Sequence, residues 1–576
     1  MSSSKTNKQT KQLRKKIMLS LMAAGVIGTV TLGASGIVEA KDIVAGGVAT
    51  QYGATDISAD TAIIGGWSFS GDNNRDMDHS EDTTSVTMND GTARMIVGGS
   101  QIMNSNDPGG TIDVGTTNVV INKGTVKGLS KTGGPTGAVI GGNYIVADDT
   151  WRGSMFANTN VKGVTNVTIN GGTFEAPIIA GSVAQNLGEA VKEGKRIVAY
   201  NDKTNLTIKG GAYPEIYNPK YIYKIDEDGF EDIEYSYTGN AIYAGGAAMG
   251  SGAEADVKNA VVTLDGLNQN VDLENPGEDE FRGYVEVYGG GLSHAGGSTS
   301  VENVTINVIN AKNIAINAGG SAVSVPYTVP DTEDPTKEML IPHADFKNAD
   351  DLASNTYAHV GTATINIHNG QIWNLWLAGE GWNEYMGEQG PGLTSVVDNT
   401  VVNYYGGMIG EINAPGAKNT VLNLENNLEL DVPQVGKENK NYVPKISFSG
   451  EFNKRISEYD ESGNPVYSVP KISEFIINAK HHDIGGSITV NADREENEQW
   501  DNYAEMVIND ANTISGNITV NRDGHLFLNK TNTIKGDIFA NGNSSIEGYE
   551  VGTVDGNLIA EKNASINEAS GMIVGK

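Results

Sequence analysis

Cysteine is absent from this 576-residue chain, which excludes disulfide bonds, thiolate metal sites and cysteine nucleophiles. Basic residues are also scarce, because 40 Lys and Arg stand against 71 Asp and Glu, for a formal net charge of -31. A chain this acidic repels nucleic-acid phosphates and anionic lipid, so nucleic acid is excluded as a partner. Without disulfides, the fold must be stabilised by apolar burial and by continuous hydrogen-bonded ladders.

The first 40 residues have the layout of a secretory signal peptide. Six positive charges precede an apolar stretch that begins at Ile17, and Val38-Glu39-Ala40 offers a cleavage site of the small-x-small type. A retained transmembrane anchor is the alternative, although several glycines and threonines make the stretch weakly apolar for that role. The leader holds six positive charges and one negative charge, so its removal changes the net charge from -31 to -36. We expect an exported protein at the cell surface or outside the cell.

The last sixty-odd residues repeat with a period of 20 residues. Thr513, Thr533 and Thr553 open equivalent segments, and each is followed by a glycine, a short alternating strand and a polar turn. A repeat of this length cannot close a core of its own, so it must stack on its neighbours. The sequence therefore predicts an all-β fold, a parallel β-helix (β-solenoid) with inserted loops and hairpins.

Longer versions of the same unit occur upstream, with apolar residues at alternate positions that predict one buried and one solvated face. The clearest runs from Thr165 to Gly181. Pairs of glycines close many units, where we expect them to permit a positive φ or a close approach of the backbone at a corner. No helix or P-loop lysine accompanies them, which argues against phosphate binding. These pairs are Gly98-Gly99, Gly141-Gly142, Gly245-Gly246, Gly289-Gly290 and Gly319-Gly320.

The interruptions of the repeat define the expected organisation of the chain. We predict a signal peptide (1–40), an N-terminal cap or irregular segment (41–84), a β-helix with insertions (85–480) and a regular stem of 20-residue repeats (481–576). The long insertions are expected at 186–240, 326–358 and 451–472. Within the middle one, four prolines exclude a coil, and residues 344–352 could form a short helix.

Two insertions predict protruding hairpins. One turns at Asp228-Gly229 and the other around Ser462-Gly463, between Tyr459 and Tyr467. Exposed tyrosines can bind protein or glycan, and the alternative is that they pair across the hairpin and only stiffen it. The candidate binding residues of the first hairpin region are Tyr217, Tyr221 and Tyr223.

A second candidate binding region is rich in tryptophan. Residues 373–385 hold three of the six tryptophans of the chain. Trp373 and Trp376 do not share one face of an alternating strand, so at least one should point outward. Tryptophan rings beside carboxylates can form a groove for sugars, and paired glutamates are the apparatus of glycoside hydrolysis. The residues concerned are Trp373, Trp376, Trp382 and Tyr385, with Glu380, Glu384 and Glu388 nearby.

Metal and catalytic motifs are weak. Oxygen ligands at alternate positions suit calcium, but Met77 and Thr83 stand where an EF-hand needs glycine and glutamate. We expect no cofactor, with calcium at these ligands as the alternative. His481-His482 lacks a third zinc ligand at useful spacing, and no G-x-S-x-G nucleophile elbow is visible. The candidate calcium ligands are Asp72, Asn74, Asp76 and Asp78.

The export leader, the absence of cysteine, the acidic Gly/Asn/Thr-rich repeats and the C-terminal N-T-I-x-G-x-I-x-V series together resemble the passenger domains of Gram-negative autotransporters. The resemblance covers about residues 85–576. It implies a right-handed parallel β-helix at the outer membrane that acts as an adhesin. It also implies a translocating β-barrel after the passenger, whereas Gly575-Lys576 follow the repeats directly. Either the chain is incomplete, or the barrel is a separate protein, or the product is released or held by other means.

Three functions remain open from the sequence. The first is adhesion, in which outward loops contact a protein or glycan of a host or neighbouring cell. The second is a polysaccharide lyase or glycoside hydrolase on a β-helix, which the scarcity of Lys and Arg on the outward positions makes the minority interpretation. The third is a structural spacer of a surface layer. We expect a non-enzymatic adhesin.

Overall fold

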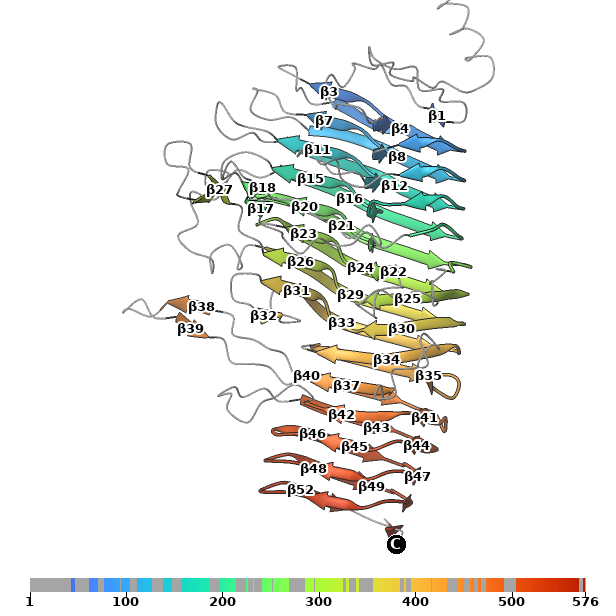
Figure 1. Cartoon of the computed structure of the whole chain (residues 1–576), viewed down its shortest axis with the longest axis vertical. Helices are drawn as coiled ribbons and strands as arrows, with labels where there is room; N and C mark the ends of the chain where they lie inside the picture. The colour runs from blue at the N-terminus through green and yellow to red at the C-terminus, as the bar shows by residue number, and fades with distance from the viewer. Residues whose placement is uncertain are drawn as a thin grey trace, which may run out of the picture.

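The computed structural model is a rod of stacked coils that runs from the N-terminal end, blue in Figure 1, to the C-terminal end in red. All of its described elements are β-strands, as expected from the repeats. The structure describes residues 43–46, 62–70, 77–93, 95–103, 111–126, 138–147, 157–186, 197–213, 224–225, 231–232, 241–250, 252–268, 285–294, 296–324, 328–330, 338–340, 356–383, 388–389, 395–415, 417–431, 444–449, 456–459, 465–467, 473–491, 504–568 and 573–574.

Sheet A runs the whole length of the rod. Its 15 strands are parallel except at the N-terminal end, where β1 lies antiparallel on β4 and covers that edge. In order, the strands are β1 (Ile43–Gly46), β4 (Met77–Met88), β8 (Thr111–Ile121), β12 (Ala157–Ile169), β16 (Ile197–Ile208), β21 (Ala253–Leu264), β24 (Ser298–Val308), β29 (Tyr357–Ile367), β33 (Ser395–Tyr404), β35 (Asn419–Leu424), β40 (Ser473–Asn478), β43 (Ala504–Asn509), β46 (Gly524–Asn529), β49 (Ser545–Tyr549) and β52 (Ser565–Glu568).

Sheet B is parallel throughout its described strands and faces sheet A. It is formed by β2 (Ala62–Ile64), β6 (Met95–Val97), β10 (Ala138–Ile140), β14 (Ile178–Ile179), β19 (Ala241–Tyr243), β22 (Val285–Tyr288), β25 (Ala311–Asn317), β30 (Gly370–Trp376), β34 (Met408–Pro415), β37 (Lys445–Ser449), β42 (Ser487–Val490), β45 (Ile518–Val520), β48 (Ile538–Ala540) and β51 (Leu558–Ala560), with β36 (Glu429–Leu430) beside β34.

Sheet C is confined to the N-terminal part of the rod. It consists of β3 (Ser68–Ser70), β7 (Gln101–Met103), β11 (Tyr144–Ala147), β15 (Val183–Asn186), β20 (Ala247–Met249), β23 (Leu292–His294), β26 (Ser321–Ser324), β31 (Glu380–Asn383) and the antiparallel β32 (Glu388–Gln389). Short strands link sheets A and B: β5 (Thr92–Ala93), β9 (Thr125–Val126) and β13 (Thr173–Phe174) in the N-terminal part, and β41 (Ile484–Gly485), β44 (Thr513–Ser515), β47 (Thr533–Ile534), β50 (Thr553–Val554) and β53 (Ile573–Val574) in the stem.

The 20-residue period is confirmed by the strand register. Thr513 pairs with Thr533, which pairs with Thr553, and Ile518 pairs with Ile538 in the same way. Upstream, Thr117, Thr165 and Thr204 lie side by side on sheet A, so the longer copies of the unit are in register as well. The parallel stack begins at β2, so coils start ahead of residue 85, where the sequence led us to expect the first one.

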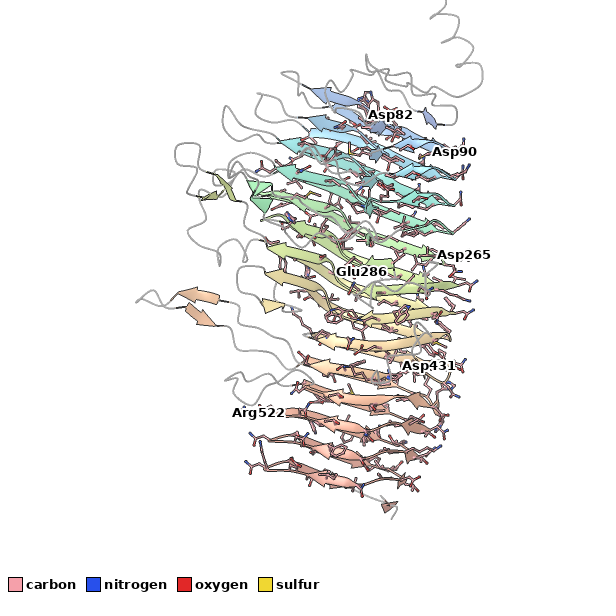
Figure 2. The ribbon with its side chains drawn as sticks, viewed as in Figure 1. Asp82, Asp90, Asp265, Glu286, Asp431 and Arg522 are labelled. Carbon is pink, nitrogen blue, oxygen red and sulfur yellow. The ribbon has the colours of Figure 1, made fainter. Side chains whose placement is uncertain are left out.

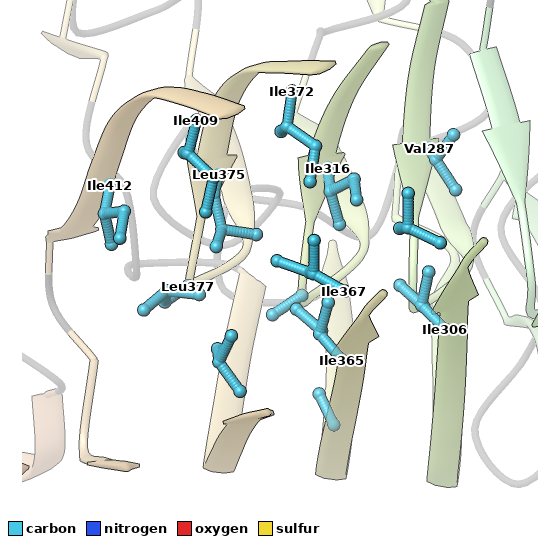
Figure 3. Close-up of a cluster of buried hydrophobic side chains, with 14 of the residues drawn as sticks. Val287, Ile306, Ile316, Ile365, Ile367, Ile372, Leu375, Leu377, Ile409 and Ile412 are labelled. Carbon is cyan, nitrogen blue, oxygen red and sulfur yellow. The ribbon is translucent and has the colours of Figure 1, made fainter. Parts of the chain in front are cut away.

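The core is built from aligned apolar columns of sheets A and B. Val287, Ile316, Ile372, Leu375, Ile409 and Ile412 of sheet B face Ile306, Ile365 and Ile367 of sheet A (Figure 3). Every one of these side chains is completely buried. Burying a side chain of this size contributes about 1.5 to 3 kcal/mol, so the repeated columns replace the missing disulfides as the source of stability.

Glycines form the sharp corner between sheets B and C. One column of this corner contains Gly66, Gly99, Gly142 and Gly181, and the amide of each donates to the carbonyl of the glycine in the next coil at 2.7 to 3.0 Å. A Cβ on Gly142 would lie 2.8 Å from Asn201 Nδ2, so close approach is what requires glycine there. The described corner glycines of these pairs have no positive φ.

Small antiparallel hairpins are attached to the rod. The predicted turns at Asp228-Gly229 and Ser462-Gly463 are flanked by paired strands, β17 (Lys224–Ile225) with β18 (Glu231–Asp232) and β38 (Ile456–Tyr459) with β39 (Pro465–Tyr467). A third hairpin, β27 (Thr328–Pro330) with β28 (Glu338–Leu340), lies in the proline-rich insertion. The hairpins β27–β28 and β38–β39 stand away from the coils on one side of the rod (Figure 1). Residues 344–352 lie outside the described residues.

Candidate glycan-contact face

Trp373 and Trp376 both lie on the outer face of sheet B. Ile372 and Leu375 of β30 are fully buried, and two residues separate them instead of one. Trp373 is the extra residue of a bulge, because Ile372 pairs with Ile314 whereas Asn374 pairs with the next residue, Ala315. The expectation that at least one of the two tryptophans points outward is therefore confirmed.

A second bulge on the neighbouring strand holds Trp373 in place. Asn313 of β25 is unpaired in the register and has a φ of 56°, in the left-handed region that asparagine tolerates. The indole Nε1 of Trp373 donates to Asn313 Oδ1 at 3.3 Å. The two extra residues of adjacent coils thus bond to each other, which fixes the orientation of the indole ring.

Polar side chains surround the two rings. Trp376 lies between Asn317 and Asn413 in the register of sheet B, and Asn413 Nδ2 donates to Asn374 Oδ1 at 3.1 Å. Glu411 forms an ion pair with Lys445, with Nζ and Oε1 3.1 Å apart. We call Trp373, Asn374, Trp376, Glu411, Asn413 and Lys445 the tryptophan face.

The tryptophan face has the chemistry of sugar recognition. Indole rings cover the C–H faces of a pyranose, while amides and a carboxylate bond its hydroxyls and fix its orientation. Hydrolysis needs two carboxyl groups across the scissile bond, whereas Glu411 is the one described carboxylate in this set and it is paired with Lys445. The buried Nε1 of Trp376 has no hydrogen-bond partner within the described part of the chain.

Several predicted residues lie elsewhere or beyond what is described. Trp382 belongs to β31, where it pairs with Val323 and Gln389. It therefore lies on sheet C, whereas the tryptophan face lies on sheet B. Glu380 opens the same strand and Glu388 begins β32. Tyr385, Glu384, Tyr217, Tyr221 and Tyr223 lie outside the described residues, so their predicted contacts stay predictions.

The predicted calcium ligands are described only at their last member. Asp72, Asn74 and Asp76 lie outside the described residues. Asp78 is exposed, and the hydroxyl and backbone N–H of Ser80 donate to its Oδ1 at 2.6 and 3.0 Å, which lowers its pKa below 3.8. Where side chains are described, no group of three or more His, Asp or Glu could hold a metal ion.

One charged cluster was missed by the sequence reasoning. On the outer face of sheet A, His359 Nε2 and Lys418 Nζ both bond the carboxylate of Asp398, at 2.8 and 2.9 Å. Partial burial opposes ionisation of Asp398, but these hydrogen bonds outweigh it and hold its pKa below 3.8. The three residues are far apart in sequence, and only a correct alignment of the coils would have brought them together.

A ladder of asparagines was also missed. Seven asparagines on successive strands of sheet A are linked by six hydrogen bonds of 2.9 to 3.1 Å, each from Nδ2 to the Oδ1 of the preceding coil. The signal was present, because seven successive copies of the repeat have an asparagine at the same outward position. The members are Asn307, Asn366, Asn403, Asn423, Asn478, Asn509 and Asn529.

Comparisons with known proteins found no matching family model, no matching curated relative and no matching solved structure. Within the described residues, no helix is long and apolar enough to cross a membrane.

Proposed function

We propose that this chain is an exported adhesin that binds a glycan of a host or neighbouring cell through the tryptophan face. The observation that supports the proposal is that both Trp373 and Trp376 point outward, beside amides from adjacent strands. The export leader and the resemblance to autotransporter passengers support a position at the cell surface. Charged side chains such as Asp90, Asp265 and Asp431 on the outside of the rod keep it soluble there (Figure 2).

The architecture supports adhesion in a second way. A rigid rod carries a contact face away from its point of attachment, and the stacked sheets keep that face preorganised, which lowers the entropy lost on binding. The tryptophan face lies on β30, β34 and β37, upstream of the regular stem.

Substitution rather than deletion tests the proposal, because residues 373–376 are part of β30 and their removal would break sheet B. The full chain is tested on an array of neutral and uronate-containing glycans, then on cells that bear the bound glycan. We expect Trp373→Ala and Trp376→Ala each to weaken binding about tenfold. Phe539→Ala is the matched control, since Phe539 occupies an outward position in the stem, in the same column of sheet B as Trp376.

Three results would contradict the proposal. Binding could be unchanged in the tryptophan double variant, or the Phe539→Ala control could weaken it equally. Release of shorter oligosaccharides from a bound glycan, abolished by Glu411→Gln, would instead favour the polysaccharide-cleaving alternative.

A further inference from the structure

A stripe of apolar side chains runs along the outer face of sheet A in the C-terminal half of the rod. The stripe occupies one column of five consecutive strands, and each member is partly exposed beside a fully buried neighbour such as Val402 or Ile477. At about 4.8 Å between strands, it is about 19 Å long. Its members are Val401, Val421, Ile476, Val507 and Phe527.

The same column is polar near the N-terminus. There it contains Ser85, Asn118, Asn166 and Asn205, of which the last three are joined by amide hydrogen bonds of 3.0 Å. Between these residues and the stripe the column holds Val261, Thr305 and Thr364, so an unbroken apolar run occurs in one segment of the described column. A partly exposed apolar column that continues over several coils and is flanked by polar columns is a candidate contact surface.

The asparagine ladder lies directly beside the stripe, two positions along each strand. An asparagine amide has two donors and two acceptor lone pairs, and the ladder uses one of each at interior members such as Asn423 and Asn478. Each coil therefore retains one donor and one acceptor for a ligand, repeated about every 4.8 Å. Hydroxyl groups, which both donate and accept, match this pattern.

The charges beside the stripe narrow the class of ligand. Glu474 and Glu505 lie in the next column, and Glu547 follows Phe527 in the column of the stripe itself. The imidazole of His525 is 3.8 Å from both Glu505 and Glu547. This acidic margin repels polyanions. A peptide strand is also disfavoured, because the backbone groups of sheet A are bonded between its own strands and leave no edge on this face.

We propose that this face binds a neutral polysaccharide lying parallel to the axis of the rod. Sugar rings would place their C–H faces on the apolar stripe and their hydroxyls on the asparagine ladder, with roughly one ring for each coil. The site is separate from the tryptophan face, which lies on sheet B, and it does not depend on binding there.

The test uses the full chain in affinity electrophoresis and calorimetry with two soluble neutral polysaccharides, a β-glucan and a galactomannan, and with alginate as a polyanion. We expect at least one neutral polymer to bind and alginate not to bind. The double variant Val421→Lys/Val507→Lys should weaken binding about tenfold, which is about 1.4 kcal/mol. Val261→Lys is the matched control, because Val261 occupies the same outward column upstream of the stripe.

A second pair of variants guards against misfolding. Val421→Thr/Val507→Thr preserves shape, so it should keep the melting temperature close to that of the unaltered chain and still weaken binding. The double variant Trp373→Ala/Trp376→Ala should leave binding at sheet A unchanged, which separates this site from the proposed adhesive one. The inference is overturned if no neutral polymer binds, if the stripe variants bind as well as the control, or if they change only self-association in analytical ultracentrifugation.

Discussion

The hydroxyl of Ser182 occupies the space that a side chain on Gly142 would need. A Cβ built on Gly142 would overlap Ser182 Oγ and would lie 2.8 Å from Asn201 Nδ2. That hydroxyl accepts the backbone N–H of Asn143 at 2.9 Å. The corner between sheets B and C is therefore built on glycine in one coil and on a polar side chain of the next.

Substitution of the corner glycine should destabilise the rod. We expect Gly142→Ala to lower the free energy of unfolding by about 1 to 3 kcal/mol, because the methyl group must displace a buried hydrogen-bonded network. Ala180→Gly is the matched control: the first corner position accepts alanine in this chain, and the change should cost only about 0.5 to 1 kcal/mol. Urea denaturation followed by circular dichroism measures both. Equal effects would show that packing at the second glycine is not restrictive.

Asn201 should contribute more to the free energy of unfolding than an outward asparagine of the same strand does. Its Oδ1 accepts the backbone N–H of Ser182 and its Nδ2 donates to Thr165 Oγ1, both at 2.9 Å and fully buried. Asn201→Ala leaves these partners unpaired, with an expected loss of about 2 to 4 kcal/mol. Asn205→Ala removes one partly exposed bond, 3.0 Å to Asn166, and should cost under about 1 kcal/mol. A smaller loss for Asn201→Ala than for Asn205→Ala would contradict this account.

The stability of the rod should decrease in mild acid because of His294. Burial lowers the pKa of His294 from 6.5 to about 4. The neutral imidazole is favoured in the folded state, so the stabilisation is complete above the unfolded pKa of about 6.5 and decreases as the pH falls towards about 4, by up to about 3 kcal/mol. We expect His294→Gln to lack this component when unfolding is measured between pH 4 and 7. Parallel pH profiles of the variant and the unaltered chain would argue against it.

Removal of one whole coil from the stem should be tolerated. Thr513 pairs with Thr533 and Ile518 with Ile538, so deletion of residues 513–532 places each remaining residue in an equivalent position. Because a solenoid is stabilised mainly by contacts between neighbouring coils, we expect a cooperative melt with a slightly lower midpoint. Deletion of residues 513–522 is the control, since half a coil cannot restore the register. Similar melting of the two deletions would disprove a strict 20-residue unit.

The architecture could be predicted because the repeat fixes both spacing and face. Thr513, Thr533 and Thr553 are identical at equal intervals, and alternation in the Thr165 copy places Val167 and Ile169 in the core. The glycine pairs also indicated corners, although the sequence did not show that close approach, rather than a positive φ, is the reason for them.

The sites were harder to predict, for three physical reasons. A bulge changes the side-chain alternation locally, so the spacing of Trp373 and Trp376 could not show that both point outward. Adjacent apolar pairs such as Val507 and Ile508 obscure which member faces the core, which hid the stripe on sheet A. Contacts such as His359 with Asp398 need the alignment of separate coils before they can be seen.

The core column of sheet A joins Leu422 to Ile477, Ile477 to Ile508 and Ile508 to Leu528, residues that are 55, 31 and 20 positions apart in the chain. Each coil thus returns to the same place whatever length of chain has left it in between. New segments can be gained, lost or exchanged at the corners during evolution without any adjustment of the strands. The rod is in this sense a display scaffold, on which surface loops can diversify under selection while the fold remains constant.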